Sequence, residues 1–461
     1  MPTYKHSVEL PFSVQTVFAW HMRPGALERL TPSFEDVRVV DRVGTVRDNG
    51  TVTLAVKKAG MRVRWKLRHA EFEQDRLFAE EQVAGPFGRW KHWHRFEPTE
   101  SGGCRVEDEV HWEPPLGALG QMMGGGAAER ELRRLFDFRH TRLRNDLTRH
   151  ASAPEGTGPL TVAMTGASGF VGTALTAFLE TGGHKVVRMV RRRPPEGSED
   201  VYWDYKREVI DVERLDGVDA VVHLAGESLA DGRWDDAKKR AIRDSRTLGT
   251  RFLAEALGRI RPVPKVLISA SAIGYYGNRG NQRLVEGSSP GSGFLAQVCQ
   301  DWEAATASAE RARIRVVHLR SGLILSGAGG ALPQMLLPFK MGAGGRLGGG
   351  KQYISWIDLD DMVGLIHHAL VNPNVTGALN ATAPNAVPNA TFTTALGRVL
   401  HRPTVIPLPG LAIRALFGEK GRALLLEGAR VLPDKAEKTG FSFLFPGLEE
   451  SLRFQLGRME S

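Results

Sequence analysis

The stretch LTVAMTGASGFVGTALTAFLE, residues 160–180, decides the fold of the larger part of this chain. An apolar run leads into a glycine-rich turn, and a helix-forming segment follows. Gly166 allows a tight turn, Gly169 lets the backbone approach a ligand, and Gly172 lets the helix pack closely on the strand. The pattern predicts a strand, a turn and a helix whose N-terminus faces the pyrophosphate of a dinucleotide.

Strand and helix patterns alternate after this unit. The alternation predicts an α/β fold with a doubly wound parallel sheet, covered by helices on both faces. The predicted strands are 160–166, 185–191, 219–226, 264–271 and 314–322, and the predicted helices are 170–182, 235–259 and 294–311.

The second predicted strand indicates which dinucleotide is bound. An NAD site places an acidic residue about 20 residues after the glycine turn, where it accepts a hydrogen bond from the ribose 2′-hydroxyl. This chain reads VVRMVRRRPPEG (186–197) there, with no acid before Glu196. Guanidinium groups suit a 2′-phosphate, so Arg191 and Arg192 predict NADP(H). The alternative is a solvated basic loop without a ligand.

The first 150 residues follow a different pattern. Short segments with alternating apolar residues predict an antiparallel sheet, and 127–150 has the period of an amphipathic helix. A curved sheet covered by such a helix can enclose an apolar cavity. His92 and His94 share one strand face, and without a third ligand in view we interpret them as cavity-lining or exposed residues and predict no metal site.

Composition limits the function classes. The net charge of +9 is the difference between 61 basic and 52 acidic side chains. The basic side chains are not concentrated in any one segment, so nucleic-acid binding is not expected. Two distant cysteines fit a reducing compartment. With no signal-like N-terminus and no apolar run of membrane length, we expect a cytoplasmic protein without a membrane span.

Two families resemble this chain. TGASGFVG together with VVHLAGE resembles the extended short-chain dehydrogenase/reductase superfamily, and SASAIGYYG, GFLAQVCQDWEAA and YISWIDLDDM resemble its NAD(P)-dependent epimerase-family subgroup. The N-terminal pattern is similar to START-like (SRPBCC) polyketide-cyclase domains, which bind hydrophobic small molecules. The resemblance implies a START-like domain over 1–155, a Rossmann domain over 158–374 and a small helical substrate lobe over 375–461.

The resemblance also implies functional residues. Ser271 matches the serine that orients the substrate oxygen, whereas Phe294 and Val298 replace the Tyr-x-x-x-Lys pair that moves the proton. Tyr275 and Tyr276 are candidate proton donors, with packing beside the nicotinamide ribose as the alternative. The expected cofactor-binding residues are Gly166, Ser168, Gly169, Phe170, Val171, Gly172, Arg191, Arg192, Leu224, Ala225 and Gly226.

Three functions follow from these observations. The first is an NADP(H)-dependent oxidoreductase of the epimerase/dehydratase-like family that acts on a hydrophobic small molecule. The second is an NADP-binding sensor or scaffold without turnover, because the proton-transfer pair is missing. The third is a carrier that holds an apolar ligand in the N-terminal domain. Nucleotide-sugar epimerisation is favoured least, because the sequence shows no efficient base.

Overall fold

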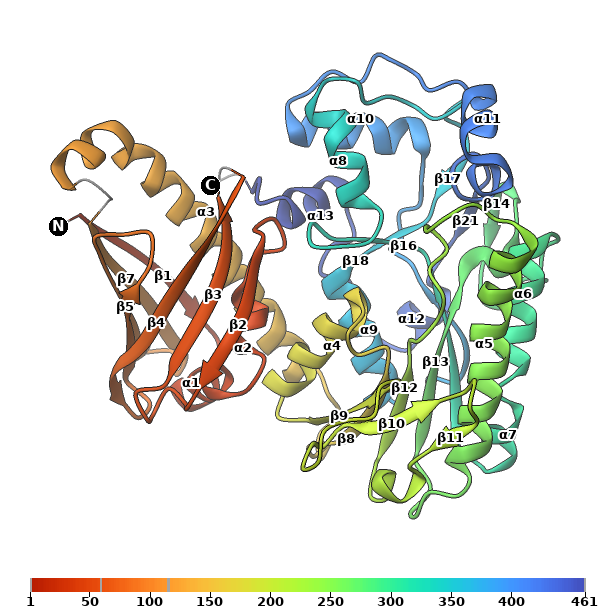
Figure 1. Cartoon of the computed structure of the whole chain (residues 1–461), viewed down its shortest axis with the longest axis horizontal. Coiled ribbons are helices and arrows are strands. Elements are labelled where there is room, and N and C mark those ends of the chain that lie inside the picture. Colours follow the sequence, from red (N-terminus) through yellow and green to blue (C-terminus); the bar gives the residue numbers. More distant parts are fainter. Residues whose placement is uncertain (1, 59, 114–116, 460–461) are drawn as a thin grey trace. The chain divides into compact units, whose positions relative to one another are not determined.

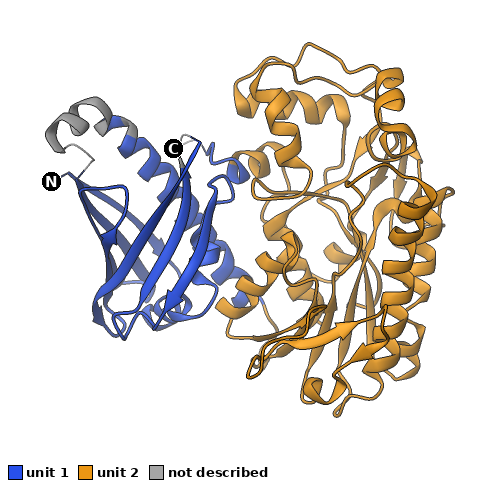
Figure 2. Cartoon of the chain, viewed as in Figure 1, with its two compact units in different colours: residues 1–152, 454–461 blue, residues 153–453 orange. Residues whose placement is uncertain are grey.

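The computed structural model describes residues 2–58, 60–113 and 117–459 (Figure 1). The chain forms two compact units, shown in Figure 2: unit 1 contains residues 1–152 and 454–461, and unit 2 contains residues 153–453. Among the described residues, no helix combines the length and the apolar character that crossing a bilayer requires.

Unit 1 is an antiparallel sheet with helices, as the alternating pattern predicts. The strands follow the order β1-β7-β6-β5-β4-β3-β2. Their bounds are β1 (Thr3–Leu10), β2 (Val37–Val43), β3 (Thr51–Lys58), β4 (Met61–Glu73), β5 (Leu77–Ala84), β6 (Arg89–Pro98) and β7 (Cys104–Glu113), and the helices are α1 (Val14–Met22), α2 (Ala26–Leu30) and α3 (Gly117–Ala151).

One face of this sheet packs against α3. Alternate residues of β6 and β7 are buried, as expected for strands with one face toward a core. Leu132, Phe136, Leu143 and Leu147 of α3 are buried in the same two hydrophobic clusters as these strands. The amphipathic helix predicted over 127–150 therefore lies against the sheet.

Unit 2 contains the predicted doubly wound sheet. Its strand order is β11-β10-β9-β8-β12-β13-β15-β19, and all neighbours are parallel except β10 and β11. The bounds are β8 (Thr161–Thr165), β9 (Lys185–Val190), β10 (Val201–Asp204), β11 (Val209–Ile210), β12 (Ala220–His223), β13 (Val266–Ala272), β15 (Arg315–Ser321) and β19 (Gly377–Ala381).

Helices cover both faces of this sheet, each over its own apolar core. One core includes side chains of α4 (Phe170–Thr181) and α9 (Leu359–Val371), and the other those of α5 (Asp236–Leu257) and α7 (Ala307–Arg311). Helix α6 (Phe294–Ala304) contacts α5 and β13. Alternate residues of β13 face opposite cores, since Leu267 belongs to one and Ile268 to the other.

Helices α8 (Leu332–Lys340), α10 (Asn389–Leu400) and α11 (Gly410–Gly421) form a lobe of unit 2, seen at the top of Figure 1. Short strand pairs connect it to the sheet. These are β14 (Gly280–Leu284) with β21 (Ala429–Val431), β16 (Leu323–Leu325) with β18 (Trp356–Asp358), and β17 (Tyr353–Ile354) with β20 (Val387–Pro388); the last helices are α12 (Asp434–Lys438) and α13 (Leu448–Gln455).

Candidate functional site

The glycine turn joins β8 to α4 and lies against the end of β12. Gly166 has a φ of +72°, and a Cβ atom there would lie 2.9 Å from the backbone of Leu224 and of Ala225. A Cβ atom on Gly172 would lie 2.2 Å from the carbonyl oxygen of Gly166. Only glycine fits both positions, so the turn can be this tight only with these residues.

The N-terminus of α4 is open to a ligand. Gly169 is the N-cap residue and provides no side-chain hydrogen bond to the first turn. Ser168 and Gly169 are exposed, whereas Phe170 and Val171 pack partly against the sheet core. Backbone N–H groups at the start of a helix, together with the helix dipole, bind anions. This geometry fits the pyrophosphate of a dinucleotide.

The arginines after β9 differ in their partners. Arg188 donates two hydrogen bonds to Asp200, at 2.8 and 3.0 Å. Arg191 and Arg192 are exposed, and neither forms an ion pair within the described parts of the chain. These two guanidinium groups are therefore available to a phosphate group.

The end of β12 completes the predicted cofactor edge. The Leu224 amide donates to the carbonyl of Thr165 at 3.2 Å, and the Ala225 amide lies 3.3 Å from the Thr165 hydroxyl. Gly226 faces Arg246, because a Cβ atom on Gly226 would lie 3.4 Å from the Arg246 Cζ.

Arg246 of α5 lies beside the end of β12. Its Nη1 donates to the carbonyls of Glu227 and Ile242 at 3.0 and 3.1 Å, and its Cζ lies 5.0 Å from the ring centroid of Trp302. Burial lowers the pKa of the Arg246 guanidinium from its usual value. The side chain is held beside the cofactor edge.

Ser271 belongs to a buried polar cluster. Its hydroxyl donates to Glu303 Oε1 of α6 at 2.8 Å. Arg320 of β15 forms two hydrogen bonds with the same carboxylate, both 2.8 Å long. Burial opposes the charge on Arg320, but the hydrogen bonds that it donates to Glu303 raise its pKa. In this arrangement the Ser271 hydroxyl donates its hydrogen bond to a protein side chain, Glu303, and not to a bound ligand.

The structure brings both candidate tyrosines to this cluster, in different environments. The Tyr276 hydroxyl donates to Asn380 Oδ1 at 2.7 Å and accepts from Arg320 Nη1 at 2.9 Å, and the residue is fully buried. Burial raises the pKa of Tyr276. Tyr275 is only partly buried, and the Arg320 Cζ lies 3.5 Å from its ring centroid. Of the two, only Tyr275 keeps an accessible ring.

An apolar cluster stands where the Tyr-x-x-x-Lys pair is expected. Phe294 starts α6 and packs edge-on against Trp234, with ring centroids 5.6 Å apart. Val298 is 3% exposed and belongs to the cluster of Trp234 and Ile242. These side chains do not transfer protons, so other residues must do so if the protein has acid–base chemistry.

Several polar residues of these sites are not evident from the sequence. Glu303, Arg320 and Asn380 join the Ser271 cluster from α6, β15 and β19. In unit 1, Glu80 lies beside His92 and His94 and provides the third group that the sequence pattern lacks. An acidic residue within an alternating apolar strand, such as Asp108 in CRVEDEVHW, is the sequence signal that points to such buried clusters.

The parts of the chain match three families. Residues 162–381 match the NAD dependent epimerase/dehydratase family, and residues 10–138 match the polyketide cyclase / dehydrase and lipid transport family. Residues 408–455 match a domain of unknown function.

Related proteins and solved structures agree with this division. An epimerase family protein of Mycobacterium bovis is 45% identical over 297 residues, which are 64% of this chain and 98% of that protein. A crystal structure of the nucleoside-diphosphate sugar epimerase from Corynebacterium glutamicum has a TM-score of 0.81 and 34% identity, covering 98% of this chain and 90% of that one.

The human epimerase family protein SDR39U1, crystallised with NADPH, is similar to the larger part of the chain. That structure has a TM-score of 0.59 and 33% identity, covering 65% of this chain and 100% of the human one. The glycine turn, the parallel sheet and these relatives lead to one conclusion: the chain is an NAD(P)-binding member of the NAD dependent epimerase/dehydratase family, with an N-terminal polyketide-cyclase domain.

Proposed function

We propose that unit 2 binds NADP(H) and catalyses hydride transfer to or from the carbon of a carbonyl or hydroxyl group in an apolar small molecule. The observation that carries the proposal is the combination of an open helix N-terminus at Gly169 with two exposed arginines that have no ion-pair partner within the described residues. The similarity to the human protein crystallised with NADPH supports the phosphate-bearing form of the cofactor.

Three segments bind different parts of the cofactor: the glycine turn, the arginines after β9 and the end of β12. The backbone N–H groups after Gly169 hold the pyrophosphate, and Arg191 and Arg192 hold the 2′-phosphate of the adenosine ribose. NADPH, when bound, supplies a hydride to an electrophilic carbon. Leu224, Ala225 and Gly226 form the wall of the site at the carboxyl end of β12.

Proton transfer is assigned to Tyr275. A carbonyl oxygen that becomes an alcohol takes up one proton, and a partly exposed phenol next to the site provides it. Arg320 lies over the Tyr275 ring and holds it in place. Ser271 binds Glu303, and Glu303 binds Arg320, so Ser271 acts as a positioning residue for this tyrosine. The buried Tyr276 hydroxyl is already hydrogen-bonded to Asn380 and Arg320, so it is not assigned the proton transfer.

The lobe indicates an apolar substrate. The loop that leads into α8 contacts the cofactor turn, because a Cβ atom on Gly329 would lie 2.9 Å from the Phe170 ring. Helix α11 is held to the segment after β12 by Lys420, which donates to two carbonyls there. Large apolar side chains are exposed on and next to these helices, namely Leu337, Met341, Leu411, Leu416 and Phe417. Such a surface suits a hydrophobic ligand.

Turnover of NADPH with a panel of apolar ketones and aldehydes tests the proposal. General acid catalysis contributes roughly 10²–10⁴-fold to a rate, so Tyr275→Phe is expected to lower kcat by at least about a hundredfold without changing the NADPH affinity. Tyr353→Phe is the matched control, because Tyr353 is also partly buried and also has a guanidinium group, that of Arg430, 5.5 Å from its ring centroid. Its kcat is expected to equal that of the wild type.

One observation favours a second function. Phe294 and Val298 fill the place of the proton-transfer pair with an apolar cluster, as in a protein that binds the nucleotide without turning it over. NADPH binding without oxidation by any compound of the panel would overturn the oxidoreductase proposal and support a sensor. Nucleoside-diphosphate sugars complete the panel, because one relative carries that name. Turnover of these sugars alone would replace the proposed substrate class.

A further inference from the structure

A cluster of histidine and carboxylate side chains lies inside unit 1, on the sheet face toward α3. His92 and His94 extend from β6, and Glu80 extends from the neighbouring strand β5. Strand pairing places Glu80 directly opposite His92, and Asp108 of β7 directly opposite His94. The cluster therefore depends on the register of three strands, which holds its members on one face.

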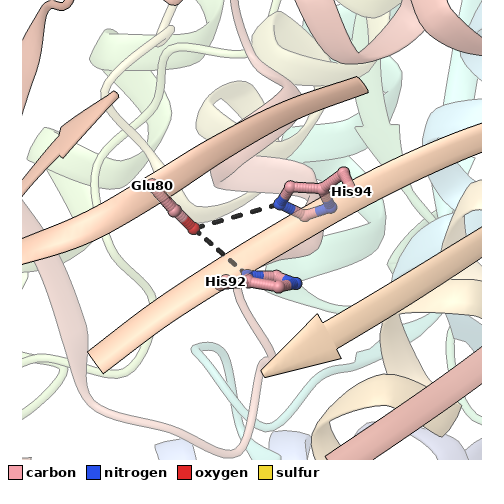
Figure 3. A group of neighbouring side chains, drawn as sticks. All are labelled: Glu80, His92 and His94. Carbon is pink, nitrogen blue, oxygen red and sulfur yellow. Dashed lines mark ion pairs between the residues drawn. The ribbon is translucent and has the colours of Figure 1, made fainter. Parts of the chain in front are cut away.

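The ring nitrogens of the two histidines point in two directions. His92 Nε2 lies 2.8 Å and His94 Nδ1 lies 2.7 Å from the same oxygen of Asp108. The opposite nitrogens, His92 Nδ1 and His94 Nε2, face Glu80 Oε1 at 3.4 and 4.0 Å (Figure 3). Asp108 thus accepts from one nitrogen of each ring and leaves the other nitrogen directed at Glu80.

This arrangement matches the outer shell of a metal site. Histidines that bind a metal through one nitrogen usually donate the other N–H to a carboxylate, which fixes the tautomer and the ring orientation. Asp108 does this for both rings. His140 Nε2 also lies 2.6 Å from the second oxygen of Asp108, so that carboxylate is held from three sides.

The spacing of the inner atoms fits a small cation. One ring nitrogen each of His92 and His94 and a Glu80 oxygen all lie within 4.8 Å of one another. Ligand atoms about 2.0–2.1 Å from a tetrahedral zinc ion are about 3.4 Å apart, so a modest movement of His94 would complete the geometry. Both rings are held by neighbours: Phe78 stacks on His94 with centroids 4.2 Å apart, and Phe136 packs edge-on against His92 at 5.4 Å.

The carboxylates around the cluster can compensate the charge of a divalent cation. The carboxylates of Glu80 and Asp108 both lie against the two imidazole rings. A divalent cation carries a charge of +2, which compensates these two carboxylates. The partly buried Arg139 guanidinium also interacts electrostatically with both carboxylates, and His21 and His69 are further titratable neighbours.

We infer that Glu80, His92 and His94 form a site for a divalent first-row transition metal, with Asp108 as the positioning residue. Two imidazole nitrogens and one carboxylate oxygen suit zinc or iron(II) and disfavour calcium and magnesium, which prefer oxygen ligands. Three protein ligands leave at least one coordination position for water or for an oxygen-bearing ligand. Glu80, whose side chain is 18% exposed, is the most accessible of the three.

Metal binding to the full-length chain tests this inference. The chain is stripped with a chelator and then dialysed against Zn²⁺ or Co²⁺. We expect one tightly bound ion per chain by elemental analysis, and a visible Co²⁺ absorption band without a thiolate charge-transfer band. No thiolate band is expected, because Cys104 and Cys299 are buried and are not part of the cluster. An equal concentration of Mg²⁺ should not displace the bound ion.

Variants separate this site from adventitious binding. Glu80→Gln and His94→Gln keep the size of the side chains and should abolish the bound ion, whereas Asp108→Asn should weaken binding by roughly 10–100-fold. His111→Gln is the matched control, because His111 forms an imidazole–carboxylate pair with Glu109 at 2.7 Å on the other face of the sheet. Far-UV circular dichroism of the metal-free variants serves as the control that each one is folded.

Two results would overturn the inference. One is the absence of a bound ion or a visible band in the folded wild-type chain at millimolar Co²⁺. The other is a bound ion whose stoichiometry and spectrum are the same in wild type, Glu80→Gln and His94→Gln. Either result would make the cluster a network of ion pairs and hydrogen bonds only.

Discussion

Arg191 and Arg192 differ from Arg188 in what surrounds their guanidinium groups. Arg188 is held by Asp200, whereas the other two are exposed and form no ion pair with a described residue. A charged side chain without a protein partner at the edge of a nucleotide site is available to the ligand. The preference for NADPH over NADH, which we propose, therefore depends on these two residues.

The double variant Arg191→Ala/Arg192→Ala should weaken NADPH binding and leave NADH binding nearly unchanged. A hydrogen bond to a charged group contributes about 1.5–3 kcal/mol, and about 1.4 kcal/mol is a tenfold change in Kd. We expect the Kd for NADPH, measured by calorimetric titration, to rise by roughly tenfold to a hundredfold. Arg259→Ala/Arg311→Ala, which removes two other exposed arginines, should change neither affinity. A parallel loss of both nucleotides in the first variant would contradict the assignment.

The residues predicted from sequence are those whose role is local. Gly166, Gly169 and Gly172 follow from the geometry of a single turn, and the arginines follow from their distance to it. Glu303 and Arg320 could not be predicted, because their contact depends on which strand lies next to β13. Glu80 was missed for the same reason: β5 pairs with β6 only in the folded sheet, and the sequence does not give that register.

At the scale of elements, a buried hydrogen-bond network connects the strands beneath the cofactor turn to the helices on one face. His223 of β12 binds the Thr165 hydroxyl of β8 at 2.6 Å and the Thr250 hydroxyl of α5 at 3.0 Å. Trp302 of α6 donates to the same Thr250 hydroxyl at 2.9 Å. Because four elements meet at these side chains, the network fixes the sheet edge that carries the glycine turn.

His223 should make the stability of the protein depend on pH. Burial lowers its pKa from 6.5 to about 4. In the unfolded chain the ring takes up a proton as the pH falls through 6.5, but in the folded chain it does so only near pH 4, so acid favours unfolding. Between pH 7.5 and 5 this residue should cost about 2 kcal/mol of unfolding free energy.

Urea denaturation at both pH values measures this effect. In His223→Gln the loss of stability between pH 7.5 and 5 should be smaller by about 2 kcal/mol, although the variant is less stable at pH 7.5. His401→Asn is the control, because His401 is exposed, and asparagine tolerates its φ of +54°. An unchanged pH dependence in His223→Gln would show that folding does not lower the pKa of His223.

The elements themselves were predictable where their periodicity is strong. The buried strands of the parallel sheet and the long helix α3 have clear apolar patterns, and the structure confirms the fold class of both parts. Strands β17 and β20, which pair with each other, have only two residues each and no periodicity to detect. Their pairing is decided by contacts with distant segments.

At the scale of the whole molecule, the C-terminal residues complete unit 1. Residues 454–461 cluster with residues 1–152. The Phe454 ring is 1% exposed and stacks on Phe138 of α3, with centroids 4.8 Å apart. Arg134, also of α3, donates to the carbonyls of Leu456 and Gly457 at 2.9 and 2.7 Å. The end of the chain therefore covers part of the long helix of its first unit.

Phe454→Ala should accordingly destabilise unit 1 although the substitution lies near the other end of the chain. Replacing a buried phenylalanine by alanine costs about 3–5 kcal/mol, because apolar contacts are lost and a cavity remains. The expected result is faster hydrogen exchange of the α3 amides, because unit 1 opens more easily. The exchange of amides in β8 and β12 of unit 2 should be unchanged. Leu411→Ala, at a side chain that is 80% exposed, should leave both units unaffected. Faster exchange in unit 2 alone would mean that Phe454 stabilises the parallel sheet instead of unit 1. A fragment of residues 1–152 would then need no C-terminal segment to reach its full stability.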